Sequence, residues 1–194
     1  MYKQKEKRFR KQATFSETGN WKKNKTQSRE VQIIMKEYKE IQVALLGLGT
    51  VGLGVYKVLQ MQKEEMQHKI GTEIKIKKIL VRNLEKAAGK IEDASVLTNN
   101  WQEIVNDDKI QIVIEVMGGM EPARTYIMEA MQAGKQVVTA NKDLIAADGK
   151  ELMDQAKKSG CDLLFEAAVA GAIPIIRPLK QCLAGNHLSE IMGI

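Results

Sequence analysis

The sequence predicts an α/β protein with a mostly parallel sheet and helices on both faces, because three patterns coincide. Short apolar runs typical of buried strands alternate with amphipathic segments of helical length. The run at 110–116 is apolar almost throughout, as in strands that helices cover on both sides. A G-x-G-x-x-G turn at Gly47, Gly49 and Gly52 follows the first apolar run. Together these patterns are typical of a Rossmann-type, doubly wound sheet.

The first half of the chain predicts strands and helices in alternation. Residues 41–46 predict a buried strand, and the helix after the glycine turn is expected to run to about His68. The predicted apolar stripe of this helix comprises Val51, Val55, Val58, Leu59 and Met66. The segment 71–81 predicts a second strand. A short helix, capped by Asn99 or Asn100, then precedes the next buried strand. The apolar residues of this short helix are Trp101, Ile104 and Val105.

The second half continues the alternation. The segment 121–134 predicts a helix with Pro122 in its first turn and Gly134 at its end, the usual asymmetry of helix termini. The further predicted elements are a strand at 136–140, a helix at 143–160, a strand at 161–169, a helix from Pro174 to Leu183 and a strand at 188–194.

The charge of the chain is concentrated at its beginning. The 194 residues carry a formal net charge of +6, but residues 1–34 contain ten Lys or Arg against three Glu, a net charge of +7. The remaining 160 residues therefore carry −1, which removes the charge argument for nucleic-acid binding by the folded part. Residues 1–34 are also poor in apolar residues. We therefore expect a basic, disordered extension followed by one domain at 35–194.

Composition also argues against a membrane protein. The longest apolar stretch, 163–176, is shorter than the roughly 20 residues that a membrane-spanning helix needs, and it contains Glu166. In such apolar surroundings the Glu166 carboxylate needs hydrogen bonds, an ion pair or a bound cation. Cys161 and Cys182 supply neither a disulfide framework nor a metal-ligand spacing. We therefore expect a soluble protein of the reducing cytoplasm.

The residues that follow each strand are the candidates for ligand binding, because parallel sheets bind ligands at the carboxyl ends of their strands. The three glycines of the turn permit a tight bend, close approach of the backbone to a pyrophosphate, and close packing of the helix on the sheet. The start of the helix then offers unpaired N–H groups to the phosphates. This succession of strand, turn and helix favours a bound dinucleotide.

Further candidates follow the later strands. Arg82 stands where NAD-binding domains usually carry an acidic residue, and a guanidinium there favours the 2′-phosphate of NADP. The open alternative is that Arg82 is solvated at the sheet edge and that Glu85 is the acidic residue that binds the ribose hydroxyls of NAD. Gly118 and Gly119 either let the chain pass beneath a cofactor or supply a turn with positive φ. Lys142 is either an exposed lysine or a cation that stabilises an oxyanion during hydride transfer.

Four segments, in this order and spacing, resemble homoserine dehydrogenase: GLGTVG at 47–52, EVMGGMEPA at 115–123, VVTANKDLIA at 137–146 and EAAVAGAIPIIRPL at 166–179. The resemblance covers about residues 39–194. It implies the NAD(P)-binding domain of an enzyme that interconverts L-homoserine and L-aspartate 4-semialdehyde in threonine and methionine biosynthesis. It also implies that the full-length protein is a homo-oligomer.

The resemblance carries over to individual residues. Cofactor or nearby substrate positions fall on Leu48, Thr50, Val51, Arg82, Gly118, Gly119, Thr139 and Lys142. The sodium ion of the family, held mainly by backbone oxygens, falls on Glu166, Val169, Gly171 and Ile173. Two departures are Ala172, where relatives often have glycine, and the end of the sequence before the N-G-T-T-N segment and the catalytic lysine and aspartate. Because hydride transfer needs both partners held in place, we expect nucleotide binding with little or no turnover from these 194 residues.

Two alternatives stay open at this point. One is a stand-alone nucleotide-binding or regulatory module without chemistry. The other is a dehydrogenase that acts on another small semialdehyde or amino acid. An N-G-T-T-N continuation of the coding region would favour homoserine dehydrogenase over the stand-alone module, and failure of the full-length protein to act on aspartate semialdehyde would favour the other dehydrogenase.

Overall fold

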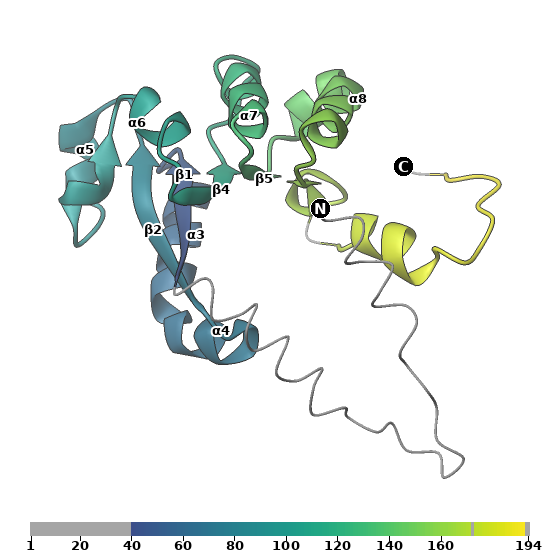
Figure 1. Cartoon of the computed structure of the whole chain (residues 1–194), viewed down its shortest axis with the longest axis horizontal. Coiled ribbons are helices and arrows are strands. Elements are labelled where there is room, and N and C mark those ends of the chain that lie inside the picture. Colours follow the sequence, from purple (N-terminus) through teal and green to yellow (C-terminus); the bar gives the residue numbers. More distant parts are fainter. Residues whose placement is uncertain (1–39, 172, 193–194) are drawn as a thin grey trace, which may run out of the picture. The chain divides into compact units, whose positions relative to one another are not determined.

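The computed structural model describes residues 40–171 and 173–192, and Figure 1 shows how their elements are arranged. Within these residues, six strands form one sheet in the order β3-β2-β1-β4-β5-β6, and every pair is parallel. The strands are β1 (Glu40–Leu46), β2 (Glu73–Leu80), β3 (Leu97–Thr98), β4 (Ile110–Glu115), β5 (Gln136–Thr139) and β6 (Leu163–Leu164). The strand order reverses between β1 and β4, where open parallel sheets form their ligand crevice.

Helices connect successive strands. They are α3 (Thr50–Met61), α4 (Lys63–Ile70), α5 (Leu84–Ala88), α6 (Gln102–Val105), α7 (Ala123–Gln132) and α8 (Lys142–Ser159). Shorter turns are the 3₁₀ segments η1 (Ala94–Val96) and η2 (Glu166–Ala168) and the π-helical η3 (Pro178–Cys182). Figure 1 shows α7 and α8 side by side along the half of the sheet formed by β4, β5 and β6, whereas α3 contacts β2.

The sheet buries apolar side chains on both faces. Leu45 and Leu46, which are successive residues of β1, are both fully buried but belong to separate clusters. Leu45 packs in a cluster with Tyr56 of α3, whereas Leu46 packs in one with Ile127 of α7. Because successive side chains of a strand point to opposite faces, these clusters are the two sides of the core. The prediction of a Rossmann-type parallel sheet with helices on both faces is therefore confirmed.

The helix after the glycine turn differs from its prediction in two ways. It is broken at Gln62, whose φ of −101° and ψ of 14° separate α3 from α4, and α4 ends at Ile70 rather than about His68. The predicted stripe is also rotated, because Val51 and Val58 are 56% and 51% exposed. The buried residues of α3 are Gly52 and Tyr56. The close packing of Gly52 on the turn, described below, determines which face of α3 meets the sheet.

The strands and helices toward the end of the chain also need correction. The strand predicted at 161–169 is reduced to Leu163–Leu164, because the backbone turns into η2 directly afterwards. No strand forms at 188–192, and 193–194 lie outside the described residues. The helix predicted from Pro174 is replaced by the shorter η3, and Pro178 stands at its first position, where no backbone N–H is required. The elements not predicted are β3 and α5.

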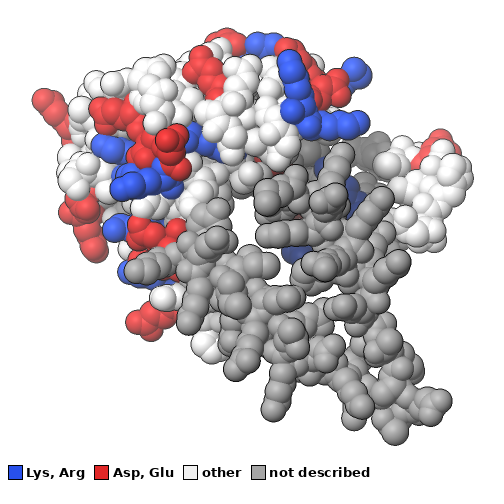
Figure 2. All heavy atoms as spheres, viewed as in Figure 1, with Lys and Arg blue, Asp and Glu red and all other residues white. Residues whose placement is uncertain are grey.

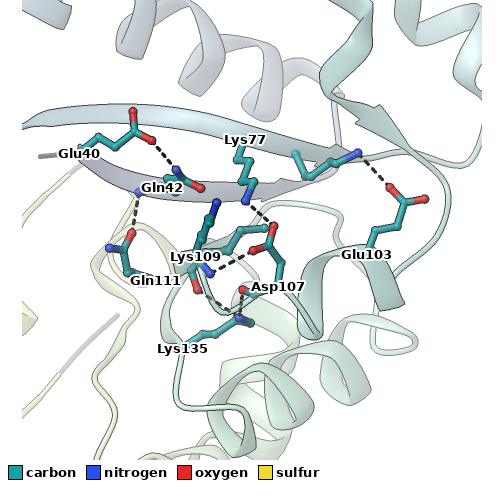
Figure 3. Close-up of polar contacts among 10 residues, drawn as sticks. Glu40, Gln42, Lys77, Glu103, Asp107, Lys109, Gln111 and Lys135 are labelled. Atoms are coloured by element: carbon teal, nitrogen blue, oxygen red, sulfur yellow. Dashed lines mark hydrogen bonds and ion pairs between the residues drawn. The ribbon is translucent and has the colours of Figure 1, made fainter. Parts of the chain in front are cut away.

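A polar cluster ties together the chain at the amino ends of β4 and β5 (Figure 3). The Lys135 ammonium donates to the backbone carbonyl oxygens of Asp107, at 2.7 Å, and Ile110, at 3.1 Å. The Asp107 carboxylate lies 2.6 Å from Nζ of Lys77. Burial lowers the pKa of Lys135, and the charges of Asp107 and Asp108 oppose this shift. The cluster stabilises the edge of the sheet opposite to the glycine turn and is not part of the candidate site.

The surface in Figure 2 carries acidic and basic side chains interspersed, without a broad area of one sign. This agrees with the near-neutral charge of the chain after residue 34. Among residues 40–171 and 173–192, no helix has the length and hydropathy needed to cross a membrane. The predicted basic extension at 1–34, and the start of the predicted domain at 35–39, lie outside the described residues.

Candidate functional site

The glycine turn joins β1 to α3 at the carboxyl edge of the sheet. Gly47 has a φ of +99°, a conformation that side chains disfavour, and its amide donates to the Leu80 carbonyl oxygen of β2 at 2.9 Å. A Cβ on Gly47 would lie 3.1 Å from both the Met117 Cα and the Val116 carbonyl oxygen. The turn is therefore held against the ends of β2 and β4.

Gly52 is the tightest position of the turn. A Cβ there would lie 2.1 Å from the carbonyl oxygen of Gly47 and 2.9 Å from its carbonyl carbon. Both are main-chain atoms, so no side-chain rotation could relieve the overlap. The first turn of α3 consequently packs directly on the turn that leads into it, as the sequence pattern predicts.

The start of α3 is left without a side-chain cap. Gly49 is the N-cap residue, no side chain accepts a hydrogen bond there, and a Cβ on Gly49 would meet no atom within 4 Å. Thr50 and Val51 in the first turn are exposed, whereas Leu48 is buried. An uncapped helix N-terminus preceded by glycine offers its N–H groups and the positive end of its dipole to an anion.

Lys90 is a basic residue of this edge that sequence reasoning missed. Its Nζ donates to the Leu48 carbonyl oxygen at 3.2 Å, which brings a positive charge to the glycine turn. Lys90 lies 42 residues after Leu48, between α5 and η1, and no pattern in the sequence links the two. Only the parallel pairing of β1 with β2 brings the segments together.

The loops after β4 and β5 meet beside the glycine turn. Gly118 and Gly119 have φ angles of +72° and +75°, which confirms the predicted turn with positive φ. A Cβ on either would meet no atom within 4 Å, so backbone conformation rather than space requires these glycines. The Asn141 side-chain amide donates to the Gly119 carbonyl oxygen at 2.6 Å. This contact joins the loop after β4 to the start of α8.

Lys142 is the first residue of α8, and its side chain is exposed. Asn141 caps the helix, since its Oδ1 accepts the Leu144 amide at 3.2 Å. Thr139 is fully buried at the end of β5, and its Oγ1 accepts the Asn141 amide at 3.0 Å. The structure therefore brings Gly118, Gly119, Thr139 and Lys142 to the same edge of the sheet as the glycine turn.

Arg82 lies after β2 at this edge, and its side chain is exposed. The next residue, Asn83, caps α5 by accepting the Lys86 amide at 2.8 Å. The carboxyl ends of β1 and β2 are neighbours, because Leu46 pairs with Leu80. Arg82 thus follows the strand next to the glycine turn.

Glu166 binds backbone amides. Its carboxylate accepts hydrogen bonds from the Ile175 amide, from the Ile176 amide at 2.9 Å and from the Arg177 amide at 2.8 Å. Desolvation acts to raise the pKa of Glu166, but these bonds and the charge of Arg177 outweigh it, so the pKa lies below its usual value. The need of this carboxylate for partners, expected from the sequence, is met by the amides that precede η3.

The proposed sodium-binding residues occupy a tight turn. Ala170 and Gly171 have φ angles of +53° and +61°, while Val169 follows η2 directly. Ala172, the predicted departure from the family pattern, lies outside the described residues. In the described part of the chain, no group of three or more His, Cys, Asp or Glu side chains is placed to hold a metal ion.

The parallel sheet has the strand order of a Rossmann-type domain, and its glycine turn packs against an uncapped helix beside the loops that follow β4 and β5. These features define a Rossmann-type dinucleotide-binding domain. Residues 47–166 match the family model described as "Homoserine dehydrogenase, NAD binding domain". The chain therefore belongs to the homoserine dehydrogenase family, as the sequence motifs indicated.

Individual relatives agree with the family match. The chain is 46% identical to homoserine dehydrogenase of Bacillus subtilis over 156 residues, which are 80% of this chain and 36% of that protein. A crystal structure of a homoserine dehydrogenase from Thiobacillus denitrificans has a TM-score of 0.70 and 47% identity, over 76% of this chain and 34% of that one. A hyperthermophilic archaeal homoserine dehydrogenase in complex with NADPH has a TM-score of 0.60 and 27% identity, over 72% of this chain and 48% of that one.

The chain spans about a third of the length of the curated relatives that it matches. The part that matches is the NAD-binding domain of a family of dehydrogenases. This does not favour the alternative of a stand-alone nucleotide-binding or regulatory module.

Proposed function

We propose that this chain supplies the nucleotide-binding part of an enzyme that interconverts L-homoserine and L-aspartate 4-semialdehyde with NAD(P)(H). The observation that carries the proposal is the start of α3 at the switch point of the sheet, which has no side-chain cap and packs through Gly52 directly on Gly47. Membership of the homoserine dehydrogenase family supports the choice of reaction. The activity belongs to the complete protein, in threonine and methionine biosynthesis.

The residues divide into two groups by their place along the dinucleotide. The pyrophosphate is held by main-chain N–H groups of the turn and the first turn of α3, formed by Gly47, Leu48, Gly49, Thr50, Val51 and Gly52. The nicotinamide end is held by Gly118 and Gly119 after β4, by Thr139 at the end of β5 and by Lys142 at the start of α8. The bound nucleotide supplies or accepts the hydride. The Lys142 ammonium stabilises negative charge on a carbonyl oxygen of the substrate.

Arg82 favours NADP over NAD. An exposed guanidinium after β2 can bind the 2′-phosphate with charge-assisted hydrogen bonds, whereas NAD offers no such group. In a fluorescence titration of the 194-residue chain, we expect NADPH to bind more tightly than NADH. Arg82→Ala is expected to weaken NADPH binding by about 10- to 100-fold, because hydrogen bonds to charged groups contribute about 1.5–3 kcal/mol. NADH affinity should change by less than about twofold.

A matched control separates this contact from a general loss of charge. Lys150→Ala removes one positive charge from the exposed face of α8, where the Lys150 ammonium lies 3.3 Å from the Asp154 carboxylate. We expect this variant to bind both nucleotides like the wild type, since exposed charges are screened by salt. Equal affinity of the wild type for NADPH and NADH would contradict the role given to Arg82.

We also propose that the complete protein acts on the amino-acid substrate as a homo-oligomer in the cytoplasm. The 194 residues alone are expected to bind nucleotide with little or no turnover, because hydride transfer needs donor and acceptor held together. An assay of the complete protein with NADPH and L-aspartate 4-semialdehyde tests the reaction. Absence of turnover with this substrate, in a protein that binds NADPH, would instead support a dehydrogenase for another small semialdehyde or amino acid.

A sodium ion is a further proposal for the segment after β6. Its ligands would be backbone oxygens of Val169, Gly171 and Ile173. The Glu166 carboxylate fits this role less well, because its oxygens already accept three backbone amides, so we assign no catalytic step to the ion. Thermal unfolding of the chain in NaCl and in KCl tests the proposal. Identical midpoints in the two salts would contradict it, since an ion that binds only the folded state raises its stability.

A further inference from the structure

The candidate site is supported from below by a buried carboxylate that sequence reasoning did not single out. Glu115, the last residue of β4, is fully buried. Its Oε1 accepts the backbone amides of Met117 at 2.7 Å and Gly118 at 3.2 Å. Its Oε2 accepts the Thr139 hydroxyl of β5 at 2.6 Å. All three partners donate hydrogen bonds, and an ionised carboxylate can only accept them.

The network continues from Thr139 into the start of α8. The Thr139 Oγ1 that donates to Glu115 also accepts the Asn141 amide at 3.0 Å. The Asn141 side chain in turn donates to the Gly119 carbonyl oxygen at 2.6 Å. Three residues from β4, β5 and the N-cap of α8 thus form one connected set of hydrogen bonds around the loop at 117–119.

A buried carboxylate is costly to the fold unless its partners compensate for the lost hydration. The sheet does not require one at the end of β4, because Ala44, Leu46 and Val113 nearby in the sheet are packed apolar residues. What Glu115 provides is a fixed path for the start of the loop at 117–119, through its hydrogen bonds to the Met117 and Gly118 amides. This loop carries Gly118 and Gly119, and through Thr139 and Asn141 its position is coupled to that of Lys142.

We propose that Glu115 is a positioning residue for the nicotinamide end of the bound dinucleotide, acting through Thr139 and Asn141. The inference rests on the proposed function, since it presumes that the dinucleotide binds at this edge. The hydrogen bonds of the Glu115 carboxylate go to the loop after β4 and to Thr139. They do not go to Arg82 or to the first turn of α3, which in the proposed function hold the adenosine end and the pyrophosphate. Its effect therefore falls on one end of the ligand.

Two ligands distinguish the two ends. NADPH carries the nicotinamide, whereas adenosine 2′,5′-bisphosphate carries only the adenosine and phosphate groups of the other end. For Glu115→Gln, which keeps the side-chain volume, we expect NADPH affinity to fall by about 10- to 100-fold, because a charged hydrogen-bond acceptor is lost from a buried network. The affinity for adenosine 2′,5′-bisphosphate should stay within about twofold of the wild type.

The same split is expected when the network is cut elsewhere. Thr139→Val removes the hydroxyl that joins Glu115 to Asn141 and leaves the carboxylate in place. The free energy of NADPH binding that the double variant Glu115→Gln/Thr139→Val loses should be much smaller than the sum of the losses of the two single variants, because both substitutions break the same network. Glu151→Gln, the same chemical change on the exposed side of α8, should leave both affinities unchanged.

The outcomes separate this inference from the proposed function. If the wild-type chain binds neither ligand, the proposed function fails. Suppose instead that the wild-type chain binds both NADPH and adenosine 2′,5′-bisphosphate. The positioning role is then wrong if Glu115→Gln binds both ligands as tightly as the wild type. It is also wrong if Glu115→Gln loses equal affinity for both ligands while its circular dichroism spectrum stays native. If Glu115→Gln does not fold, Thr139→Val decides, and an equal loss of both ligands would refute the role.

Discussion

Gly52→Ala is expected to destabilise the chain by about 3 kcal/mol or more and to remove nucleotide binding at NADPH concentrations about 100 times the wild-type Kd. The added Cβ would lie 2.1 Å from the Gly47 carbonyl oxygen, well inside contact distance. Relief requires the start of α3 to move away from the turn. That movement separates the helix N-terminus from the position where the phosphates bind. Urea unfolding and a fluorescence titration measure the two effects.

Gly54→Ala is the matched control, since it makes the same change two residues later in α3. A Cβ on Gly54 would meet no atom within 4 Å, and the residue is exposed. Because alanine favours the helix over glycine, we expect Gly54→Ala to stabilise the chain by about 0.5–1 kcal/mol and to leave NADPH binding intact. Equal stability of the two variants would show that α3 does not pack on Gly47 as described.

Trp101→Ala is expected to cost about 3–5 kcal/mol of folding free energy, a large part of the 5–15 kcal/mol typical of a domain. Trp101 is 6% exposed and stacks on Tyr126 of α7, with ring centroids 4.6 Å apart and planes inclined by 22°. Its indole N–H donates to the Glu129 carboxylate. The side chain thus joins the segment before α6 to the helix that covers β4 and β5. Denaturant unfolding measures the loss.

Trp101→Phe separates the ring contact from the hydrogen bond. Phenylalanine retains an aromatic ring against Tyr126 but leaves the Glu129 carboxylate without its donor. We expect a cost of about 1–3 kcal/mol, smaller than that of alanine. If Trp101→Ala unfolded within 1 kcal/mol of the wild type, the side chain would not be part of the core.

The order of strands and helices could be predicted because long periodic segments dominate the chain. Residues 41–46 and 110–116 are apolar runs with few polar residues, and the segment at 121–134 is bounded by Pro122 and Gly134. Each of these signals is local and strong. By contrast, β3 contains two residues, which is too short for any periodicity, and it becomes a strand because the edge of β2 is available for pairing. The strand predicted at 161–169 was too long for a similar reason, since only Leu163 and Leu164 pair with β5.

Hydrophobicity alone could not fix the rotation of α3. Val51, Val55 and Val58 follow the same helical spacing as Gly52, Tyr56 and Leu59, displaced by one residue. The structure buries Gly52 and Tyr56, because a glycine without Cβ allows the helix to approach the turn most closely. The position of Gly52 in the glycine motif indicates which face of α3 packs on the turn, whereas the apolar pattern predicted the neighbouring face.

The placement of the candidate site at one edge of the sheet could be predicted in part, because it follows from the parallel topology. The glycines, Lys142 and Arg82 follow strands and Thr139 ends one, and parallel topology alone brings such residues to one edge. Glu115, Asn141 and Lys90 were missed because their roles depend on contacts between segments distant in sequence. The one local signal for Glu115 was a charged residue inside the mainly apolar run at 110–116.

The central claim is that a dinucleotide places its pyrophosphate against the main-chain N–H groups at the start of α3. A crystal structure of this chain with NADPH tests it most directly. We predict pyrophosphate oxygens within hydrogen-bond distance of backbone amides between Leu48 and Val51, with the nicotinamide toward the loop at 117–119. NADPH bound elsewhere on the molecule, or a glycine turn left vacant at saturating NADPH, would contradict the account.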